Sequence, residues 1–269
     1  MKITLITACF NSEATIRTAI DSVLSQKGVD IEYIVVDGGS TDGTVDIIKE
    51  YSTRSTRLTF KWISEKDSGM YDAINKGIKM ATGDLVGILN ADDVLASDDT
   101  LAHIVSAFNT DSYPLVPDSS RIDAVYADIR FVREGETVEA LRKAETVRYC
   151  SAKRWRPWMF RFAAMVPHPS FYVRRECFAR LGGYSLDYRI CADFELELRY
   201  LLLAKLRAAY LPECVVVMRM GGMSTSGWRS NLVINREDLR ALRAHGIWSC
   251  MPLIYLKYLF KIWGFVFRK

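Results

Sequence analysis

The sequence predicts an α/β protein with a mostly parallel central sheet and helices on both of its faces. In roughly the first hundred residues, short apolar segments alternate with longer segments whose apolar residues recur at helical spacing. The short segments are apolar throughout, which is typical of strands covered on both faces, whereas a strand with one face in water alternates apolar and polar residues. No glycine- or serine-rich linker divides the 269 residues, so we expect one continuous main domain.

Strands and helices alternate strictly in the first half of the chain. The helix expected at residues 12–26 illustrates the pattern, because Ser12 can cap it, Gly28 suits its exit, and one face consists of Ile16, Ala19, Ile20 and Val23. The turn "GGSTDGT" opens the next helix. The expected strands are 2–8, 31–37, 58–64 and 84–90, and the expected helices are 12–26, 45–51, 70–81 and 98–108.

The second half is less regular, but it still contains apolar strands and amphipathic helices. The expected strands are 123–132, 170–175 and 214–220, and the expected helices are 175–182, 193–205 and 231–246. The last helix is charged, with an apolar stripe. We therefore divide the chain into a main domain, residues 1–230, and a helical C-terminal extension, residues 231–269.

Composition excludes some classes of protein. With 49% hydrophobic residues the chain can bury a sizeable core, and its formal net charge of +4 is too small to indicate a nucleic-acid partner. The six cysteines form no C-x-x-C pair and no zinc-finger spacing. We therefore expect reduced thiols and a cytoplasmic location.

Several acids and other candidate site residues lie at or just after the ends of the expected strands. They are Thr7, Ala8, Asn11, Asp37, Asp67, Asn90, Asp92 and Asp93. Each aspartate alone is also explained as a turn or cap residue. The carboxyl ends of parallel strands form one edge, where ligands bind, and crowded carboxylates raise one another's pKa unless a cation is present. Mg²⁺ or Mn²⁺, held by these oxygens and by substrate phosphates, is the simplest answer.

Two other nucleotide sites are excluded by their missing motifs. A dinucleotide dehydrogenase needs a glycine-rich turn after the first strand, but the turn here, "TACFNSEAT", contains no glycine. The "GGSTDG" stretch follows the second strand instead. No G-x-x-x-x-G-K-[ST] sequence is present, so the chain has no P-loop.

Several stretches together resemble family 2 glycosyltransferases of the GT-A fold. They are "TACFN", "YIVVDGGSTDGT", "SEKDSGMYDAINKG", "ATGDLVGILNADD" and "ADFELELR", in the family's order and spacing over roughly residues 1–225. The forms "SEKDSGMYDAINKGI" and "PHPSFYVRR" resemble bacterial enzymes of exopolysaccharide, capsule and O-antigen assembly, including the colanic acid type. The resemblance implies a Rossmann-like nucleotide-binding half and transfer of a sugar from a nucleotide sugar.

The resemblance also implies which residues bind the donor, which we expect to be a UDP-sugar. Asp37 would hydrogen-bond the base or ribose, Asp67 would help to bind the base, and the same pocket would include Thr7, Ala8 and Asn11. Asn90-Ala91-Asp92 occupies the family's D-x-D position, so Asp92 would ligate Mn²⁺ or Mg²⁺ bound to the diphosphate. Asn90 departs from the usual acid there. Asp93 would contact the sugar or support the metal site.

The remaining implied role is that of the catalytic base. Asp193 occupies the family's position for it, and an acceptor hydroxyl must lose its proton as it attacks the anomeric carbon with inversion. The alternative for Asp193 is an ordinary helix cap, and Glu195 is the reserve candidate for the base. His168, between two prolines, fits contact with acceptor or donor, or a structural role in its loop.

A glycine-rich segment follows the last expected strand. In relatives the segment corresponding to "GGMSTSG", residues 221–227, is often a mobile loop over the diphosphate, so its backbone or Arg219 would touch phosphate. The alternative is a flexible connector.

The C-terminal segment 247–269 mixes aromatic residues with lysines. Lys257 and Lys261 lie four apart, hence on one helical face, and the aromatics are Trp248, Tyr255, Tyr258 and Trp263. Such a helix would lie in the headgroup plane of an anionic membrane, where a lipid-linked acceptor is found. Residues 148–162, also rich in cations and aromatics, would share that surface or line the acceptor site. The alternative is a helix packed on the core.

Two other functions stay open beside the glycosyltransferase. A sugar nucleotidyltransferase shares the α/β core, but it carries a glycine-rich, basic loop after the first strand, which "TACFNSEAT" lacks. A glycan-binding module of the same fold without turnover would not need Asp92 and Asp193.

Overall fold

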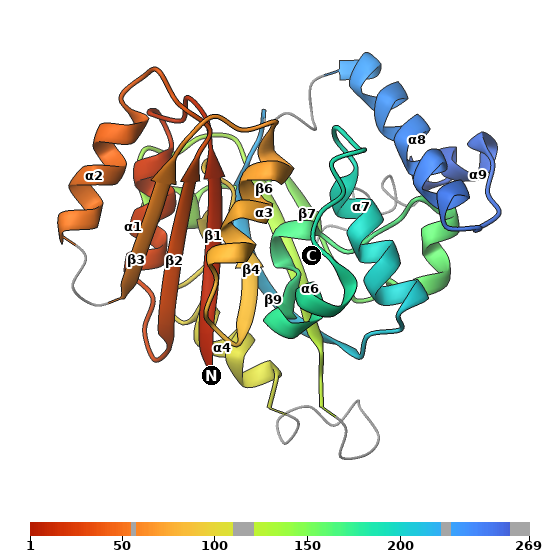
Figure 1. The fold of residues 1–269 in the computed structure, drawn as a ribbon, viewed down its shortest axis with the longest axis horizontal. Coiled ribbons are helices and arrows are strands. Elements are labelled where there is room, and N and C mark those ends of the chain that lie inside the picture. Colours follow the sequence, from red (N-terminus) through yellow and green to blue (C-terminus); the bar gives the residue numbers. More distant parts are fainter. Residues whose placement is uncertain (55–57, 110–120, 222–226, 259–269) are drawn as a thin grey trace.

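The computed structural model describes residues 1–54, 58–109, 121–221 and 227–258. In this part of the chain the strands form one nine-stranded sheet in the order β3-β2-β1-β4-β8-β6-β9-β5, with β7 paired to β6 (Figure 1). The sheet is curled, and helices cover both of its faces. The predicted α/β class with helices on both faces is confirmed.

The first half has the predicted alternation of strands and helices. The strands β1(Lys2–Cys9), β2(Asp30–Asp37), β3(Thr59–Ser64) and β4(Leu85–Ile88) pair in parallel. Between and after them lie α1(Ile16–Leu24), α2(Thr44–Arg54), α3(Met70–Met80) and α4(Thr100–Ala107). Helix α1 is shorter than expected, because a turn precedes it and Thr15 is its N-cap. In that turn the Ser12 carbonyl accepts from the Thr15 and Ile16 N–H groups. Gly28 follows with φ +70°, as expected of a helix exit.

The second half of the sheet is mixed. β8(Tyr172–Arg174) runs antiparallel between β4 and β6(Ala124–Val132), and β9(Ala208–Arg219) is parallel to β6. β5(Val94–Leu95) pairs antiparallel with β9, and β7(Arg148–Cys150) pairs antiparallel with β6. Strands as short as β5 and β7 carry too few residues for a periodic pattern, so the sequence did not predict them.

Strand β9 begins earlier than the expected residue 214. It is 12 residues long, and its register against β6 shifts around Asp128. Pro212 lies within β9 and cannot donate a ladder hydrogen bond, and an irregular register accommodates such a residue. Because of Pro212 and Glu213, the sequence pattern did not indicate the first half of this strand.

The remaining helices differ from the expectation in varying degree: α6(Arg175–Leu181) agrees to within one residue, and α8(Gly227–Ala244) begins four residues earlier than the predicted 231. The single helix predicted at 193–205 is α7(Ala192–Glu197) continued by the π-helical segment η4(Leu198–Leu203). The other segments are α5(Val138–Lys143), η2(Pro157–Phe162), η3(His168–Ser170) and α9(Met251–Tyr255). No described helix is both long enough and apolar enough to cross a membrane.

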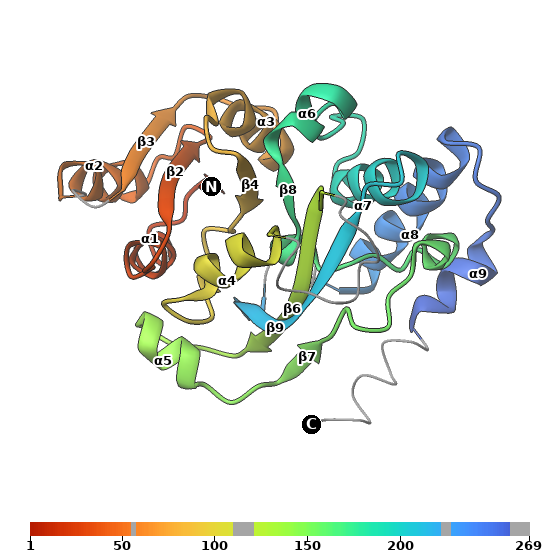
Figure 2. The same cartoon turned by 90° about the horizontal axis from the view of Figure 1, so that it is seen from below.

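Two apolar cores lie on opposite faces of the sheet. Helices α1 and α4 cover one face, and α3 and α6 cover the other (Figure 2). The second core extends to α7, α8 and α9, and it includes Leu239, Leu242 and Ile254. The described part of the C-terminal extension therefore packs against the main domain.

Lys257 corrects the expectation for the C-terminal segment. It was expected to present its charge to lipid headgroups, but it is only 6% exposed and its ammonium lies 2.7 Å from the Asp238 carboxylate. Pairing on burial is what an ionised lysine requires. The charge of Lys257 therefore serves the contact between α8 and the end of α9. Lys261 and Trp263 lie outside the described residues.

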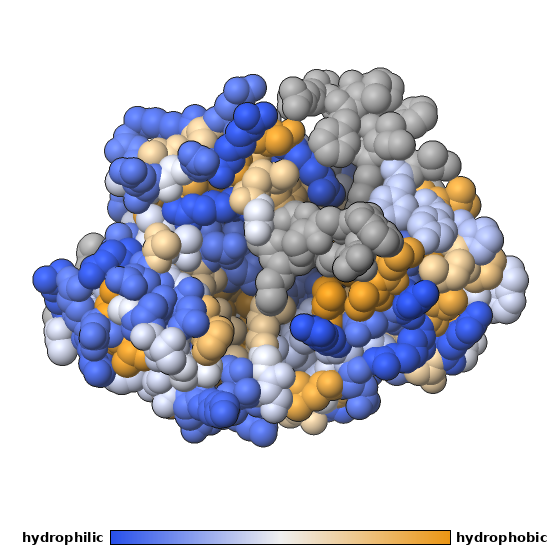
Figure 3. Space-filling view, turned by 90° about the horizontal axis from the view of Figure 1, so that it is seen from above, coloured by the Kyte–Doolittle hydropathy of each residue, from blue (hydrophilic) through white to orange (hydrophobic). Residues whose placement is uncertain are grey.

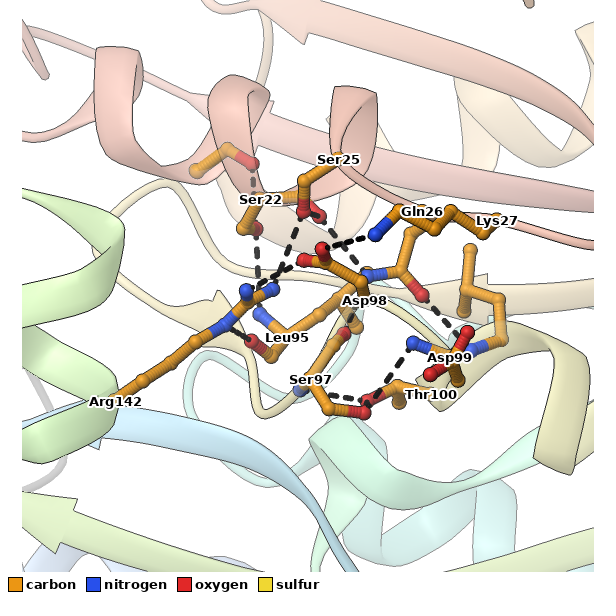
Figure 4. Close-up of polar contacts among 12 residues, drawn as sticks. Ser22, Ser25, Gln26, Lys27, Leu95, Ser97, Asp98, Asp99, Thr100 and Arg142 are labelled. Carbon is orange, nitrogen blue, oxygen red and sulfur yellow. Dashed lines mark hydrogen bonds and ion pairs between the residues drawn. The ribbon is translucent and has the colours of Figure 1, made fainter.

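A polar joint fixes the segment that follows the D-x-D position (Figure 4). The Arg142 guanidinium of α5 donates to Asp98 Oδ1 at 2.7 Å, to the Leu95 carbonyl at 2.9 Å and to Ser25 Oγ at 3.3 Å. Lys27 lies 3.0 Å from the other Asp98 oxygen. Hydrogen bonds from Arg142 and then Lys27 lower the pKa of Asp98 to about 2. The joint thus ties the end of α1 and α5 to the loop between β5 and α4.

We expect Arg142→Ala to lower the free energy of unfolding by about 1–3 kcal/mol, since it leaves three acceptors without their charged donor. Urea denaturation measures this change. The matched control is Lys143→Ala in the same helix, whose ion pair with Glu139 is about three-quarters exposed on both sides and is worth under about 0.5 kcal/mol. Because the pKa of Asp98 is lowered in the fold, the difference should shrink as pH falls from about 4 towards 2. Equal effects of the two variants would contradict the joint's role.

Candidate active site

The carboxyl ends of the parallel strands form the edge where predicted site residues gather. Parallel register pairs Cys9 of β1 with Asp37 of β2, and Asp37 with Ser64 of β3, so these strands end side by side. On the other side β4 pairs with β1 up to Ile88, just before Asn90. This edge is at the top of Figure 1, and Figure 3 is seen from that side. The loops after all four strands therefore meet at one edge.

Asp37 is completely buried at the end of β2. Its Oδ2 accepts from the Gly39 and Ser40 backbone N–H groups at 3.1 and 3.0 Å and from Ser64 Oγ at 2.7 Å, while Oδ1 accepts from Ser40 Oγ. These bonds shape the turn between β2 and α2 and join it to β3. The role of Asp37 in holding a nucleotide remains a prediction, and the carboxylate is rigidly placed for it.

The residues predicted at the end of β1 face different ways. Asn11 is exposed, has a positive φ of 48°, and accepts from the Thr41 N–H at 2.9 Å, so it joins the first loop to the β2–α2 turn. Thr7 is buried, and its hydroxyl lies 2.9 Å from the Tyr33 hydroxyl. Ala8 is half-buried. Of these three, Asn11 has the most surface to offer a ligand.

Asp67 lies beside Asp37 through the loop between β3 and α3. Its Oδ1 accepts from the Gly69 N–H at 2.8 Å, and a Cβ placed on Gly38 would lie only 2.5 Å from its Oδ2. Only glycine fits at position 38 without displacing Asp67. The structure thus brings together the two aspartates that the resemblance assigns to the nucleotide.

The loop after β4 separates its two acids instead of exposing both. Asp93 is completely buried, and its Oδ2 accepts from Asn90 Nδ2 at 2.7 Å. Burial, and then the neighbouring Asp92, raise the pKa of Asp93 well above its usual value. Asp92 and Asn90 are half-buried, and Ala91 is buried. Asn90, in place of an acid, therefore supports Asp93, and Asp92 is the carboxylate that reaches the surface.

Arg219 holds the same loop from the end of β9. Its guanidinium donates to the Asp92 and Gly135 carbonyls at 2.8 Å each and to Thr18 Oγ1 at 3.2 Å. The predicted contact of Arg219 with phosphate would require it to leave these partners. Residues 222–226 of the predicted phosphate loop lie outside the described residues.

The described residues supply the predicted metal ion with no preformed cluster of ligands at Asp92. In residues 1–54, 58–109, 121–221 and 227–258, no group of three or more His, Cys, Asp or Glu could enclose a metal ion. Mg²⁺ and Mn²⁺ at nucleotide sites need only one or two carboxylates, because phosphates and water complete the shell. Burial raises the pKa of Asp92, and its own backbone N–H and Arg219 oppose this. A bound cation would favour the ionised carboxylate in the same way.

Asp193 lies in the first turn of α7 and contacts the first turn of α3, the helix that follows the loop with Asp67. Its Oδ1 accepts from the Phe194 N–H at 2.8 Å and from the Tyr71 hydroxyl at 3.2 Å. Tyr71 is the second residue of α3, and its single hydroxyl hydrogen is shared between Asp193 and the Ile190 carbonyl, which is the shorter contact. Burial raises the pKa of Asp193 to about 6, although Phe194 and Tyr71 act to lower it. A half-buried carboxylate with this pKa suits a base that works near neutral pH.

Glu195 is held in a structural ion pair. It is only 4% exposed, and its two oxygens accept from Arg199 Nε and Nη2 at 2.9 Å each, while Nε2 of His245, directly after α8, lies 2.8 Å from Oε1. Burial acts to raise the pKa of Glu195, but Arg199 and His245 lower it overall. This arrangement makes Glu195 a link between α7 and α8, and it favours Asp193 over Glu195 as the base.

His168 lies behind the base in a row of aromatic residues. Its Nε2 is 2.6 Å from the Tyr184 hydroxyl, and the Tyr184 ring stacks on Tyr71 at 5.5 Å between centroids. Burial lowers the pKa of His168 to about 4, so the imidazole is neutral at pH 7. Sequence reasoning missed Tyr71 and Tyr184. Tyr71, within "SGMYDAIN", is the one that the motif itself could have indicated.

Glu197 is a second residue that the sequence did not reveal. It lies one helical turn after Asp193, has no exposed surface, and accepts from the Val166 N–H at 3.2 Å through one oxygen only. Burial, and then the charge of Asp193, raise its pKa well above the usual value. We therefore expect a protonated Glu197 behind Asp193, which leaves Asp193 as the ionisable carboxylate of that turn.

Comparison with known sequences matches this arrangement to one family. Residues 4–175 match the model of Glycosyl transferase family 2, more than half of the chain. The chain is 30% identical over 239 residues to a "PGL/p-HBAD biosynthesis glycosyltransferase" of Mycobacterium tuberculosis, covering 88% of this chain and 82% of that protein. It is 35% identical over 96 residues to "Putative glycosyltransferase EpsH" of Bacillus subtilis, covering 36% and 27% respectively.

Solved structures show the same fold at low identity. "Mannosyltransferase PcManGT from Pyrobaculum calidifontis in complex with GDP-Man and Mn2+" superposes with a TM-score of 0.64 at 22% identity, covering 95% of this chain and 68% of that one. S. aureus TarS 1–349 in complex with UDP-GlcNAc gives 0.62 at 17% identity, covering 90% and 66%. The chain spans 40% of a longer TarS chain. These likenesses show the predicted GT-A fold.

We expect Asp193→Asn to raise the free energy of unfolding at pH 7.5 by about 1–3 kcal/mol and to leave it unchanged at pH 4. The pKa of Asp193 is raised in the fold to about 6 from 3.8. The contribution of protonated Asp193 to the free energy of unfolding is therefore fully present below pH 4. It is lost as pH rises through 6, because the buried carboxyl then ionises. Denaturant unfolding at the two pH values measures the difference. The control is the exposed Asp99→Asn, and a variant at position 193 that is no more stable at pH 7.5 would contradict the burial cost.

Proposed function

Because the chain belongs to glycosyl transferase family 2, we propose that it is an inverting transferase using a nucleotide-diphosphate sugar, with a UDP-sugar as the expected donor. Its acceptor is a glycan or a lipid-linked glycan in cell-surface polysaccharide assembly. The observation that carries the proposal is the contact between Tyr71 and Asp193, which joins a carboxyl with a pKa of about 6 to the first turn of α3, directly after the loop from β3. That same loop carries Asp67 beside Asp37, the two residues assigned to the nucleotide.

The donor would lie along the edge formed by the ends of β1–β4. Asp37 and Asp67 would bind the nucleoside, with Asn11, Thr7 and Ala8 around it. Asp92 would hold Mn²⁺ or Mg²⁺ against the diphosphate, a role supported by its half-buried position and by the Arg219 bond to its carbonyl. Related folds are known with UDP-GlcNAc and with GDP-Man and Mn²⁺. Asp93, fully buried, would act by supporting this loop.

The proposed reaction exchanges one bond at the anomeric carbon for another. The acceptor oxygen attacks that carbon from the face opposite the diphosphate, the bond to the diphosphate oxygen breaks, and the acceptor's proton goes to Asp193. A divalent ion, when bound, supplies positive charge that stabilises the departing diphosphate. Tyr71 orients the Asp193 carboxylate, and His168 would act through Tyr184 and Tyr71 as a positioning residue.

Two rival functions fit fewer observations. A sugar nucleotidyltransferase would need a basic, glycine-rich loop after β1, and that loop here is "TACFNSEAT". An inactive glycan-binding module would have no use for a base of raised pKa beside the loop of the nucleotide aspartates. The polysaccharide role and the inner face of the cytoplasmic membrane are parts of the proposal. The relatives' names cover both a PGL/p-HBAD and an EpsH protein.

We expect Asp92→Ala to abolish the Mn²⁺-dependent part of UDP binding. The reason is that the substitution removes the carboxylate proposed to hold the ion against the diphosphate. Titration calorimetry with UDP, with Mn²⁺ and with EDTA, measures this. The control is Asp99→Ala, an exposed aspartate further along the same segment. Undiminished Mn²⁺-dependent binding by the Asp92 variant would remove the metal role from this residue.

We expect Asp193→Asn to bind UDP normally and to lose turnover by about 10²–10⁴-fold, the usual contribution of a positioned base. Release of nucleotide diphosphate from a panel of nucleotide sugars, with an acceptor extract, measures turnover. In the wild type, kcat should rise with pH through about 6, because the base acts when ionised.

Tyr71→Phe supplies the matched variant for this assignment. It removes a hydrogen bond that lowers the pKa of Asp193, so the rise in kcat should move to higher pH while UDP binding stays unchanged. Full turnover by the Asp193 variant, or a pH profile that Tyr71→Phe leaves in place, would remove Asp193 from the base role.

A further inference from the structure

An open apolar groove lies on the side of the molecule that carries η2 and the α8–α9 connection. It has a volume of about 700 Å³ and is separate from the sheet edge described above. We call it the tryptophan groove, and its lining residues are Trp158, Arg161, Phe162, Leu202, Leu203, Gly246, Ile247 and Trp248. These residues come from three segments far apart in the sequence: η2, η4 and the α8–α9 connection.

The aromatic side chains of the groove are unusually exposed. Trp158 is 57% exposed and Trp248 is 71% exposed, while Leu203 is 43% exposed. Trp158 packs edge-on against Phe162 at 5.9 Å, so it is held in place rather than buried. Large exposed apolar patches mark interaction sites, and tryptophan is enriched where an apolar phase meets water. Two exposed tryptophans lining an apolar groove fit such a boundary.

Two of the three segments that line the groove, η2 and the α8–α9 connection, belong to stretches of the chain that contain no acid. Between Glu145 and Glu176 there is no aspartate or glutamate, and after Asp238 there is none to the end of the sequence. The first stretch carries seven lysines and arginines: Arg148, Lys153, Arg154, Arg156, Arg161, Arg174 and Arg175. The net charge of the whole chain is only +4, so this is a strong local excess of positive charge.

The cations near η2 are available to an external anion. Lys153, Arg154, Arg156 and Arg161 are all exposed, and among the described residues none of the four forms an ion pair with a carboxylate. Lys257 differs, because Asp238 neutralises it in the interior. The positive charge beside the groove therefore comes from residues 153–161 and not from Lys257.

The two acid-free stretches are fixed to each other. The Ser249 hydroxyl donates to the Arg161 carbonyl at 2.7 Å, and α9 packs beside η2 in both ribbon views (Figures 1 and 2). The chain continues from α9 into residues 259–269, "LFKIWGFVFRK", again without an acid and rich in aromatics and cations. This composition is typical of segments that lie at a membrane surface.

We propose that the tryptophan groove and the cations of residues 153–161 form a docking surface for a bilayer that contains anionic phospholipid. The indoles would enter the boundary of the acyl region, and the lysine and arginines would face the headgroup phosphates. This deepens the membrane location proposed above, and it does not depend on the transferase reaction. A neutral glycan is the weaker occupant, because it needs neither four unpaired cations nor the aliphatic wall of Leu202, Leu203 and Ile247.

Sedimentation with lipid vesicles tests the surface, using the full chain without donor or metal. The probes are vesicles of phosphatidylcholine alone and with about 30% phosphatidylglycerol, at low and high salt. We expect binding to the anionic vesicles, weak binding to the neutral ones, and a loss of affinity at high salt. Absence of binding to anionic vesicles would overturn the proposal.

Paired substitutions distinguish binding through this surface from non-specific adsorption to vesicles. We expect the double variant Trp158→Ser, Trp248→Ser to weaken vesicle binding at least tenfold. The double variant Arg154→Gln, Arg161→Gln should do the same, because each cation near an anionic surface is worth about fivefold. The controls are Phe10→Ser, an exposed aromatic at the end of β1, and Lys79→Gln with Arg133→Gln, which changes the net charge equally. The controls should stay within about twofold of the wild type.

The remaining outcomes distinguish other occupants and the proposed function. Wild-type binding by the double tryptophan variant would assign any membrane affinity elsewhere, for example to residues 259–269, and would overturn the groove's role. If the protein instead forms a concentration-dependent dimer that the tryptophan substitutions dissociate, and binds no vesicles, the groove contacts a second copy of the chain. That outcome would also overturn the membrane proposal. Asp92→Ala should bind vesicles like the wild type. Loss of UDP binding alone therefore concerns the transferase, and loss of vesicle binding alone concerns this surface.

Discussion

The parallel pairing of β1 with both β2 and β4 is the constraint on which the site depends. Parallel strands need long crossovers, so each strand is followed by a helix, and every strand-to-helix loop falls on the same edge. The register brings the ends of β1, β2 and β3 level, and it leaves Asp37 enclosed by the turn and by Ser64. The loop from β3 carries Asp67, against Gly38, and the helix α3 that follows it carries Tyr71, whose hydroxyl contacts Asp193. The connection from β3 into α3 thus links the nucleotide side of the edge to the proposed base in the second half of the chain.

The structure explains how two adjacent acids can end a buried strand. Asp93 turns inward to Asn90, and burial with its neighbour's charge raises its pKa. Asp92 turns outward, and Arg219 holds the backbone between them while contributing positive charge to both. Asn90 at the first D-x-D position is consistent with this arrangement, because an acid there would face Asp93 without donating to it. The departure from the usual motif therefore has a local physical reason.

Much of this could be predicted from the sequence, and the failures have physical causes. The apolar strands of the first half are continuous and long enough to show their pattern, and the aspartates after them were placed at the right edge. Strands β5 and β7 are too short to show a periodic pattern, and Pro212 interrupts the apolar pattern of β9 so that its first half was not predicted. The bond from Tyr71 to Asp193 joins residues 122 positions apart, and no local pattern encodes such a contact. The charge of Lys257 was misassigned because its partner, Asp238, lies on another helix.

The surroundings of Asp193 suit the role of base that we propose for it, because they bury it only in part. Full exposure would leave its pKa near the ordinary value, where the carboxylate holds a proton too weakly to remove one from a hydroxyl near neutral pH. Complete burial without partners would keep it protonated, as expected for Glu197 one turn later. Two hydrogen bonds, from Phe194 and Tyr71, hold Asp193 between these limits. The pKa of the proposed base is therefore set by burial first and by these two hydrogen bonds second, and the neutral His168 and Tyr184 behind Tyr71 hold the Tyr71 ring in place.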